Sequence, residues 1–256
     1  MRSRLAAAVA GLLCTAGCGG VAATPAATPP GVSGPISVFA AASLTEAFKA
    51  VQPAFEKIYP KASVQLNFEG TPTLLTQIQQ GAFADVLASA DLPNMQKAID
   101  GGLVTGTPQV FTRNQLAIVV PAGNPKHVSG LPDLARPDVL FIAAASNVPA
   151  GQYGVQALAK AGVKATPRSL ETDVKAVVAK VSLGEADAGI VYVTDVKAAG
   201  AKVMGVAIPT DQNVVASYPV AALKDAKNPE GARAFVDFLL SVGGQKLLSD
   251  FGFAPL

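Results

Sequence analysis

A buried strand that runs directly into a helix constrains the fold of this chain more than any other feature. The apolar run from Ile36 to Ala42 is typical of a strand. Ser43-Leu44-Thr45-Glu46 follows at once with the spacing of a capping box, which predicts that Ser43 begins a helix. The first N–H groups of such a helix have no partner within it and carry the positive end of its dipole, so this junction can bind an anion. Because residues 36–47 contain no Lys or Arg, dipoles and hydroxyl groups would hold that anion.

The composition favours a compact fold and argues against a nucleic-acid partner. Hydrophobic residues make up 50% of the 256 residues and charged residues only 15%, which excludes a disordered chain. The formal net charge is +2, and Arg2 and Arg4 account for both charges, because the other 18 of the 20 basic residues balance 18 acidic ones. A neutral chain without a basic stripe offers no footprint for nucleic acid or for an acidic membrane surface.

The N-terminal residues are predicted to direct export. Residues 1–17 read as a lipoprotein signal peptide, with two arginines before an apolar stretch that is too short to span a bilayer. Thr15-Ala16-Gly17-Cys18 resembles a bacterial lipobox, so Cys18 is the predicted lipid-attachment residue. The protein is therefore expected outside the cytoplasm, anchored to the cell membrane. An ordinary signal peptide cut near Ala22 or Ala23 is the alternative.

The segment that follows is predicted to be a tether without disulfides. Residues 18–34 are rich in Ala, Thr, Pro and Gly, which is typical of a flexible linker. Both cysteines, Cys14 and Cys18, lie at or before its start, so the mature domain has no internal disulfide and no catalytic thiol.

From Ile36 onward, predicted strands and helices alternate, which indicates an α/β fold with a mostly parallel sheet covered by helices on both faces. Pro53, inside the first helix, predicts a kink or a break there. The predicted strands are 36–42, 64–68, 85–90, 116–121, 139–144, 188–193, 203–208 and 217–223, and the predicted helices after the one at Ser43 are 73–80, 92–101, 151–160, 174–183, 229–240 and 247–251.

The alternation predicts two α/β lobes with a cleft between them. The chain is expected to cross between the lobes near residues 111–116 and again near 216–218. Lobe 1 is accordingly predicted to hold residues 35–115 and 218–256, and lobe 2 to hold residues 116–217.

The residue patterns of an enzyme are missing from the sequence. His127 is the only histidine and stands in a loop beside Pro125 and Lys126, which favours a surface role over general-base catalysis. The sequence has no Gly-x-Ser-x-Gly, P-loop, Gly-x-Gly-x-x-Gly or metal-ligand pattern. Asp85 and Asp91 are interpreted as structural residues, and Asp91 as a helix cap.

Several loops instead place small or hydroxyl-bearing residues directly before a predicted helix. Each residue also has a purely structural interpretation: Ser43 as a helix cap, Thr71 as a turn residue, Val174 and Tyr192 as core side chains. The loops are Ala42-Ser43-Leu44, Gly70-Thr71-Pro72-Thr73, Val148-Pro149-Ala150-Gly151 and Thr172-Asp173-Val174, and Tyr192 ends a strand.

Taken in order, these segments resemble the molybdate-binding proteins of bacterial ABC-type uptake systems, and the resemblance extends from Ile36 to Leu256. It implies a bilobed periplasmic-binding-protein fold of type II, with a parallel or mixed sheet in each lobe and a cleft between the lobes. It also implies no enzymatic activity and an oxyanion enclosed in that cleft. The implied partners are a membrane permease and its cytoplasmic ATPase, and a monomer is expected. The motifs that carry it are Val38-Phe39-Ala40-Ala41-Ala42-Ser43-Leu44-Thr45, Val148-Pro149-Ala150-Gly151, Asp173-Val174, Gly189-Ile190-Val191-Tyr192, Tyr218-Pro219-Val220 and Phe251-Gly252-Phe253.

The resemblance also implies the ligand and its contacts. Molybdate, or tungstate, would be bound without a cofactor and without a separate metal site. Hydroxyl and backbone N–H groups would come from Ser43 and Thr71, N–H groups from Ala150 and Val174, and a phenolic OH from Tyr192. The second loop departs from the family pattern, because Phe68-Glu69-Gly70-Thr71-Pro72 replaces a Ser-rich stretch: Glu69 adds a negative charge and Pro72 removes a donor.

Three other functions remain open at this point. A binding protein for sulfate or another tetrahedral oxyanion shares every feature above. An amino-acid or sugar receptor usually needs charged or aromatic platforms, and the chain has no Trp. An exported hydrolase would need a nucleophile and a base. A site built only of donors suits a fully deprotonated oxyanion, which presents only acceptors.

Overall fold

Strand β1 (Gly34–Ala41) lies in the middle of three parallel strands, as its apolar sequence predicts. The computed structural model describes residues 31–256, and in it β1 pairs in parallel with β2 (Ala62–Glu69) and with β3 (Val86–Ala88). Ile36, Val38 and Ala40 are completely buried. The helices that connect or cover these strands are α1 (Thr45–Ile58), α2 (Thr71–Gln79) and α3 (Leu92–Asp100), with the short 3-10 helix η1 (Ala42–Leu44) before α1.

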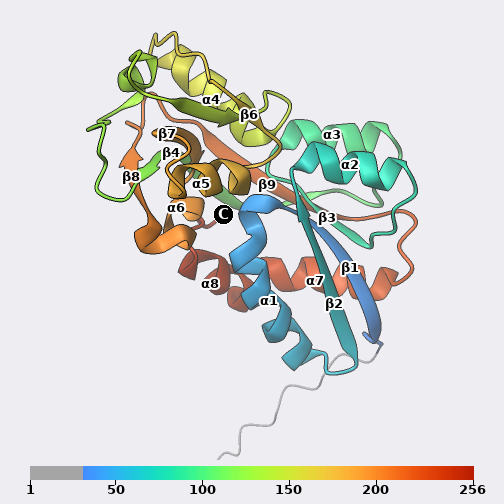
Figure 1. Cartoon of the computed structure of the whole chain (residues 1–256). Coiled ribbons are helices and arrows are strands. Elements are labelled where there is room, and N and C mark those ends of the chain that lie inside the picture. Colours follow the sequence, from blue (N-terminus) through green and yellow to red (C-terminus); the bar gives the residue numbers. More distant parts are fainter. Residues whose placement is uncertain (1–30) are drawn as a thin grey trace, which may run out of the picture.

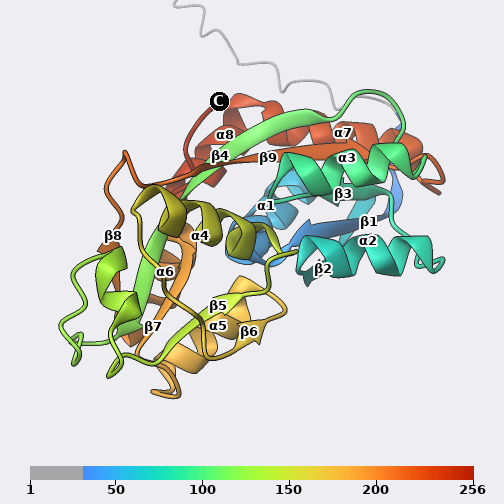
Figure 2. The ribbon, with the colours of Figure 1, turned by 90° about the horizontal axis from the view of Figure 1, so that it is seen from above.

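Strand β4 (Gln109–Pro121) is shared by the two halves of the molecule (Figure 2). Its first part, residues 109–115, pairs antiparallel with β9 (Val215–Ala222), which also pairs with β3. Its second part pairs antiparallel with β7 (Ala188–Tyr192) and with β8 (Val203–Ala207). The resulting strand order is β2-β1-β3-β9-β4-β7-β5-β6.

The second half of the molecule is built on the far end of β4. Strand β5 (Phe141–Ala144) is parallel to β7 and to the short β6 (Leu170–Glu171). Figure 1 shows its helices gathered on one side of the molecule and the C-terminal helices returning to the first half, where they pack beside α1. The remaining helices are α4 (Pro149–Lys160), α5 (Val174–Ser182), α6 (Val193–Ala199), α7 (Pro229–Leu240) and α8 (Val242–Asp250), with 3-10 turns η2 (Leu131–Ala135) and η3 (Gly200–Lys202).

Aromatic rings fasten α1 and α7 to the first half of the sheet. Phe235 on α7 packs edge-on against Phe48 and Phe55 of α1, with ring centroids 5.8 and 5.4 Å apart, and Phe48 also packs against Phe111 of β4. Such pairs add about 1 kcal/mol each to the gain from burial. The C-terminal helices are therefore part of the same core as β1, although they are far from it in sequence.

Two local predictions differ from the structure. The predicted break at Pro53 is wrong, because α1 continues across this residue from Thr45 to Ile58. Pro53 lies on the exposed face, where water can solvate the carbonyl that the proline leaves without an intrahelical donor. The expectation of a mostly parallel sheet holds for β1, β2 and β3 only, because β4 and β9 run antiparallel to their neighbours; the sheet as a whole is mixed, as the predicted fold class of parallel or mixed sheets allows.

The predicted lobe boundary at residues 115/116 falls where β4 stops pairing with β9 and begins to pair with β7. We keep the predicted division as a proposal: lobe 1 holds residues 35–115 and 218–256, and lobe 2 holds residues 116–217. The predicted signal peptide, the lipid attachment at Cys18 and nearly all of the tether lie outside the described residues. Within residues 31–256, no helix is both long and apolar enough to cross a membrane.

Candidate functional site

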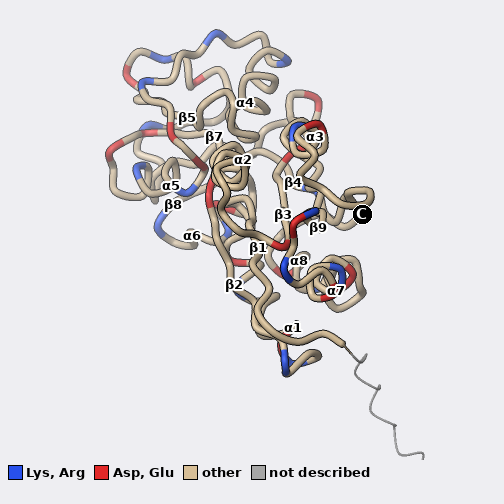
Figure 3. The backbone as a smooth tube through the Cα atoms, turned by 90° about the vertical axis from the view of Figure 1, so that its right-hand side faces the viewer, with Lys and Arg blue, Asp and Glu red and all other residues tan. Residues whose placement is uncertain are grey.

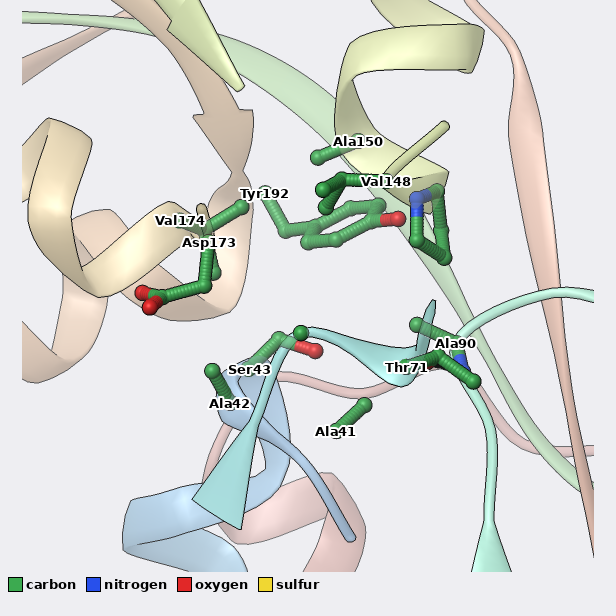
Figure 4. A pocket seen from close by; sticks show the side chains of 12 residues that line it. Ala41, Ala42, Ser43, Thr71, Ala90, Val148, Ala150, Asp173, Val174 and Tyr192 are labelled. Carbon is green, nitrogen blue, oxygen red and sulfur yellow. Dashed lines mark hydrogen bonds between the residues drawn. The ribbon is translucent and has the colours of Figure 1, made fainter. Parts of the chain in front are cut away.

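The residues predicted to bind a ligand surround one small cavity between the two lobes (Figure 4). Lobe 1 contributes the end of β1 with the turn after it, the start of α2, and Ala90 in the loop after β3. Lobe 2 contributes the N-termini of α4 and α5 and the end of β7. The cavity is small and is lined by Ala41, Ala42, Ser43, Gly70, Thr71, Ala90, Val148, Pro149, Ala150, Asp173, Val174 and Tyr192.

Ser43 faces the cavity but does not cap a helix, so the capping-box prediction is wrong. The 3-10 helix η1 places Ser43 one turn before α1, and neither η1 nor α1 has a side-chain cap. The hydroxyl oxygen of Ser43 lies 2.9 Å from the hydroxyl oxygen of Tyr218 instead. Its backbone N–H belongs to the first turn, which has no acceptor within its own helix. The hydroxyl and the backbone N–H of Ser43 therefore both lie near the cavity.

Thr71, the first residue of α2, offers the same two groups from a different turn. The N–H groups of Thr73 and Leu74 donate to the Gly70 carbonyl, and Pro72 has none, so the Thr71 N–H is the one left at this helix start. The Thr71 hydroxyl oxygen accepts the N–H of Ala90 at 3.3 Å, which leaves its hydrogen free to be donated. Pro72 and Glu69, the departures from the family pattern, are not among the residues that line the cavity.

The two helices of lobe 2 present single backbone N–H groups. The Asp173 carboxylate caps α5 by accepting the N–H groups of Lys175 and Ala176 at 2.7 and 3.0 Å, so the Val174 N–H remains without a partner in its helix. Ala150 is the second residue of α4, directly after Pro149, and its N–H also has no partner within its helix. Figure 4 shows the Asp173 carboxylate turned away from the hydroxyl of Tyr192.

Tyr192 carries a buried hydroxyl that has no partner among the described residues. The side chain is 1% exposed, and its ring lies across the cavity from Ser43 and Thr71 (Figure 4). Burial raises the pKa of this phenol well above its usual value, so it stays protonated and can act only through its O–H. An orphaned buried hydroxyl costs free energy unless a bound group satisfies it.

The electrostatics of the cavity come from dipoles rather than side-chain charge. Among residues 31–256, no Lys or Arg lines it, and its one charged lining residue, Asp173, is committed to the cap of α5. Figure 3 shows positive and negative residues interspersed on peripheral elements such as α3 and α7. The N-termini of α2, α4 and α5 bring positive dipole ends to the cavity, which can therefore hold an anion that accepts hydrogen bonds.

The two lobes touch beside the cavity. A Cβ atom at Gly70 would overlap the carbonyl oxygen of Thr172, which belongs to the loop before α5. Gly70 has φ −58° and ψ 137°, a conformation that any residue adopts, so this close approach and not backbone geometry is what a side chain would disturb. The cleft is closed in this structure.

The buried carboxylate of Asp195 fixes the backbone of Tyr192. Its Oδ2 atom accepts the backbone N–H of Tyr192 at 3.1 Å, and its Oδ1 atom lies 3.4 Å from the Lys175 ammonium. Burial raises the pKa of Asp195 to about 6, with Lys175 acting in the opposite direction. No sequence motif singles out Asp195, because its role depends on this burial.

The pKa of Asp195 predicts a pH-dependent stability. Because the pKa of Asp195 is about 6 in the folded protein and 3.8 ordinarily, the folded state binds this proton more tightly than the unfolded state. We expect this group to lower the free energy of unfolding by up to about 3 kcal/mol as the pH rises from about 4 to about 6. Asp195→Asn keeps an acceptor for Tyr192 and cannot titrate, so it should lack this part of the slope in urea unfolding. Identical slopes in both proteins would refute the prediction.

The aspartates interpreted as structural are confirmed in that role. Asp91 caps α3 by accepting the N–H of Asn94 at 3.0 Å, and Asp85 accepts the N–H groups of Ser37 and Asn228 at 2.7 and 2.9 Å. His127 has a positive φ of 52° in its loop and is not among the residues that line the cavity.

Two lobes that close on a cavity of neutral donors define a protein that binds and releases a small anion. The chain belongs to the family of bacterial extracellular solute-binding proteins, whose model matches residues 36–254. A solute-binding protein is not an enzyme, so the predicted class of function is confirmed. Proteins of this family act outside the cytoplasm. The predicted resemblance to molybdate-binding proteins is confirmed by the relatives described next.

Individual relatives agree in sequence and fold. The molybdate-binding protein ModA of Mycobacterium tuberculosis (strain H37Rv) is 39% identical over 246 residues, which cover 96% of this chain and 94% of that protein. The sulfate-binding protein SubI of the same organism has a TM-score of 0.78 at 22% identity, covering 87% of each chain. The periplasmic molybdate-binding protein of Azotobacter vinelandii has a TM-score of 0.73 at 19% identity, covering 86% of this chain and 99% of that one. These two structures show the fold, the bilobed type II periplasmic-binding-protein fold that was predicted.

Proposed function

We propose that this chain captures molybdate, and tungstate by the same contacts, in the cavity between its lobes. It delivers the anion to a membrane permease with a cytoplasmic ATPase. The sequence relationship to the ModA protein of M. tuberculosis supports the choice of anion. The metal enters only as the centre of the oxyanion, and the proposal includes no cofactor.

The observation that carries the proposal is the chemistry of the cavity lining. The residues that line the cavity can supply donors, which we propose as the ligand contacts: N–H groups of Ser43, Thr71, Ala150 and Val174, and hydroxyls of Ser43, Thr71 and Tyr192. A fully deprotonated tetrahedral oxyanion has only acceptors and satisfies such a lining completely. A protonated anion would leave its own O–H without an acceptor, which is unfavourable in a closed cavity.

The number of donors is consistent with tight binding. At about 1.5 kcal/mol for each hydrogen bond to a charged group, the seven donors named above contribute roughly 10 kcal/mol. The helix N-termini add about 0.5–1 kcal/mol each, and closing the lobes costs part of the total. The balance corresponds to a Kd between sub-micromolar and nanomolar, which suits the capture of a trace nutrient.

Isothermal titration with molybdate, tungstate, sulfate and hydrogen phosphate tests the proposal. We expect molybdate and tungstate to bind tightly with a stoichiometry of one, sulfate to bind more weakly, and hydrogen phosphate to bind weakest. Sulfate binding as tightly as molybdate would replace the proposal with the sulfate alternative. An enzyme would instead show turnover without a stoichiometric ligand.

Tyr192→Phe should separate binding from folding. The hydroxyl of Tyr192 has no protein partner, so its removal should leave the free energy of unfolding of the ligand-free protein unchanged or slightly higher. The affinity for molybdate should fall by roughly 10- to 100-fold, the value of one hydrogen bond to a charged group. Titration and urea unfolding of the same preparation measure both. Unchanged affinity would show that the phenol does not touch the ligand.

We further propose that the mature protein is a monomer held at the membrane by a lipid on Cys18. The lipobox-like sequence before Cys18 supports this anchor. Cys18→Ala, expressed in the native host, should move the protein from the membrane fraction to the soluble fraction. An unchanged distribution would favour the ordinary signal peptide.

A further inference from the structure

A second tyrosine, Tyr218, lies directly behind the cavity. It stands on β9, is completely buried, and places its hydroxyl 2.9 Å from the Ser43 hydroxyl without lining the cavity itself. The amide nitrogen of Asn114, on β4, lies 3.4 Å from the same hydroxyl. These are the two strands that run between the lobes, so the contact joins the site to the connection between the lobes.

The surroundings of Asn114 fix which way its amide points. Its Oδ1 atom accepts the N–H of Gln115 at 2.9 Å, and its Nδ2 atom donates to the Thr194 hydroxyl at 2.9 Å. The side of the amide that faces Tyr218 is therefore the NH₂ group, which donates and cannot accept.

This orientation fixes the direction of the bond between Tyr218 and Ser43. The Tyr218 hydrogen cannot go to Asn114. The Tyr192 hydroxyl is close enough to that of Tyr218 for each to affect the pKa of the other, but it lies outside hydrogen-bond geometry, so the Ser43 oxygen at 2.9 Å is the acceptor within reach. If Ser43 were the donor, the buried Tyr218 hydrogen would be left without an acceptor, which is an unfavourable arrangement in a buried site. Tyr218 is therefore the donor, Ser43 is the acceptor, and the Ser43 hydrogen is free to point into the cavity.

We propose that Tyr218 is a specificity-determining residue that holds Ser43 as a donor and so excludes protonated oxyanions. The inference rests on the proposed oxyanion site. With one acceptor site of its oxygen filled by Tyr218 and its hydrogen directed at the anion, Ser43 is a poorer acceptor for the O–H of a hydrogen phosphate or hydrogen arsenate than a hydroxyl that is free to turn. The Thr71 hydroxyl oxygen likewise accepts a hydrogen bond, from the Ala90 N–H. The Ser43 and Thr71 hydroxyls therefore each have one acceptor site filled by the protein. Tyr218 acts through Ser43 and is a positioning residue, not a ligand.

Tyr218→Phe tests this role, because it removes only the hydroxyl and releases the Ser43 oxygen. We expect the variant to bind molybdate about tenfold more weakly, the value of about one hydrogen bond. It should bind hydrogen phosphate and hydrogen arsenate no more weakly than the wild type, so that the affinity ratio of molybdate to phosphate falls at least tenfold. Competition titrations at neutral pH measure the ratio. A purely structural defect would weaken all the anions equally and leave the ratio unchanged, which would overturn the inference.

A double-mutant cycle shows whether Tyr218 acts through Ser43. In a Ser43→Ala background, Tyr218→Phe should change neither the molybdate affinity nor the ratio further, because the hydroxyl that it orients is gone. Additive effects would contradict the inference. Tyr59→Phe, at the end of α1, is the matched control and should behave as the wild type.

Two further outcomes keep the test decisive. If Tyr218→Phe does not fold, Asn114→Asp serves in its place, because a carboxylate accepts the Tyr218 hydrogen and releases Ser43; an unchanged ratio in that variant overturns the inference. A wild-type protein that binds neither molybdate nor tungstate contradicts the proposed function itself. A wild type that binds molybdate, together with an unaltered ratio in Tyr218→Phe, contradicts only the role of Tyr218.

Discussion

Saturating molybdate is expected to raise the free energy of unfolding by about 4 kcal/mol when its concentration is a thousand times the Kd. The anion binds donors from both lobes, and those donors come together only in the folded, closed chain. Urea unfolding with and without molybdate measures the difference, and sodium chloride at the same ionic strength is the control. No increase over the chloride control would mean that the folded protein does not bind molybdate.

Ser43→Ala is the matched variant for this measurement. Ser43 does not cap α1, and its hydroxyl makes one buried hydrogen bond, to Tyr218, so the ligand-free protein should lose only about 1 kcal/mol of stability. The gain from molybdate should fall by about 2 kcal/mol, because Kd rises by roughly 30-fold with the loss of a charged hydrogen bond. Equal losses of ligand-free stability and of ligand-induced gain would assign Ser43 to the fold instead.

Gly151→Ala is expected to lower the free energy of unfolding by about 3 kcal/mol and to remove most of the gain from molybdate. Gly151 lies in the first turn of α4, directly after Ala150, and a Cβ atom there would overlap the carbonyl oxygens of Ala144 and Ala145 at the end of β5. Backbone atoms cannot rotate away, so α4 and the Ala150 N–H must shift. Urea unfolding and titration measure the two effects.

Gly243→Ala provides the control for that substitution. Gly243 lies in the first turn of α8, and a Cβ atom there would meet only the Ser241 hydroxyl, at 3.8 Å. Alanine should therefore stabilise this helix by about 0.5–1 kcal/mol. If the two substitutions had equal effects, the crowding at the start of α4 would not be what requires glycine at position 151.

Local sequence patterns predicted the elements whose neighbours in space are also neighbours in sequence. The apolar runs at β1 and β3 and the cap at Asp91 depend on a few consecutive residues, and each is found in the structure. A crossing strand was predicted near residues 111–116, but its pairing with β9, about a hundred residues later, was not, because neither segment specifies its partner by its own sequence. Helix α6 was missed because Val193 follows β7 without any break in the sequence.

The candidate site, too, was predicted only in part. The residues that line the cavity, except Ala90, lie in loops or motifs that the sequence had singled out, and the structure brings them together. The hydrogen bonds that orient them could not be predicted. Ser43 and Tyr218 are 175 residues apart, and Tyr218 appeared in the sequence only as part of a motif without a role. The cap assigned to Ser43 was wrong because a single 3-10 turn intervenes before α1.

A crystal structure of the molybdate complex, with anomalous scattering from molybdenum, tests the central claim most directly. We expect one molybdenum site in the cavity, with its oxygens within hydrogen-bond distance of Ser43, Thr71, Ala150, Val174 and Tyr192 and without a Lys or Arg in contact. Anomalous density outside the gap between the lobes, or an anion surrounded by cationic side chains, would contradict the account.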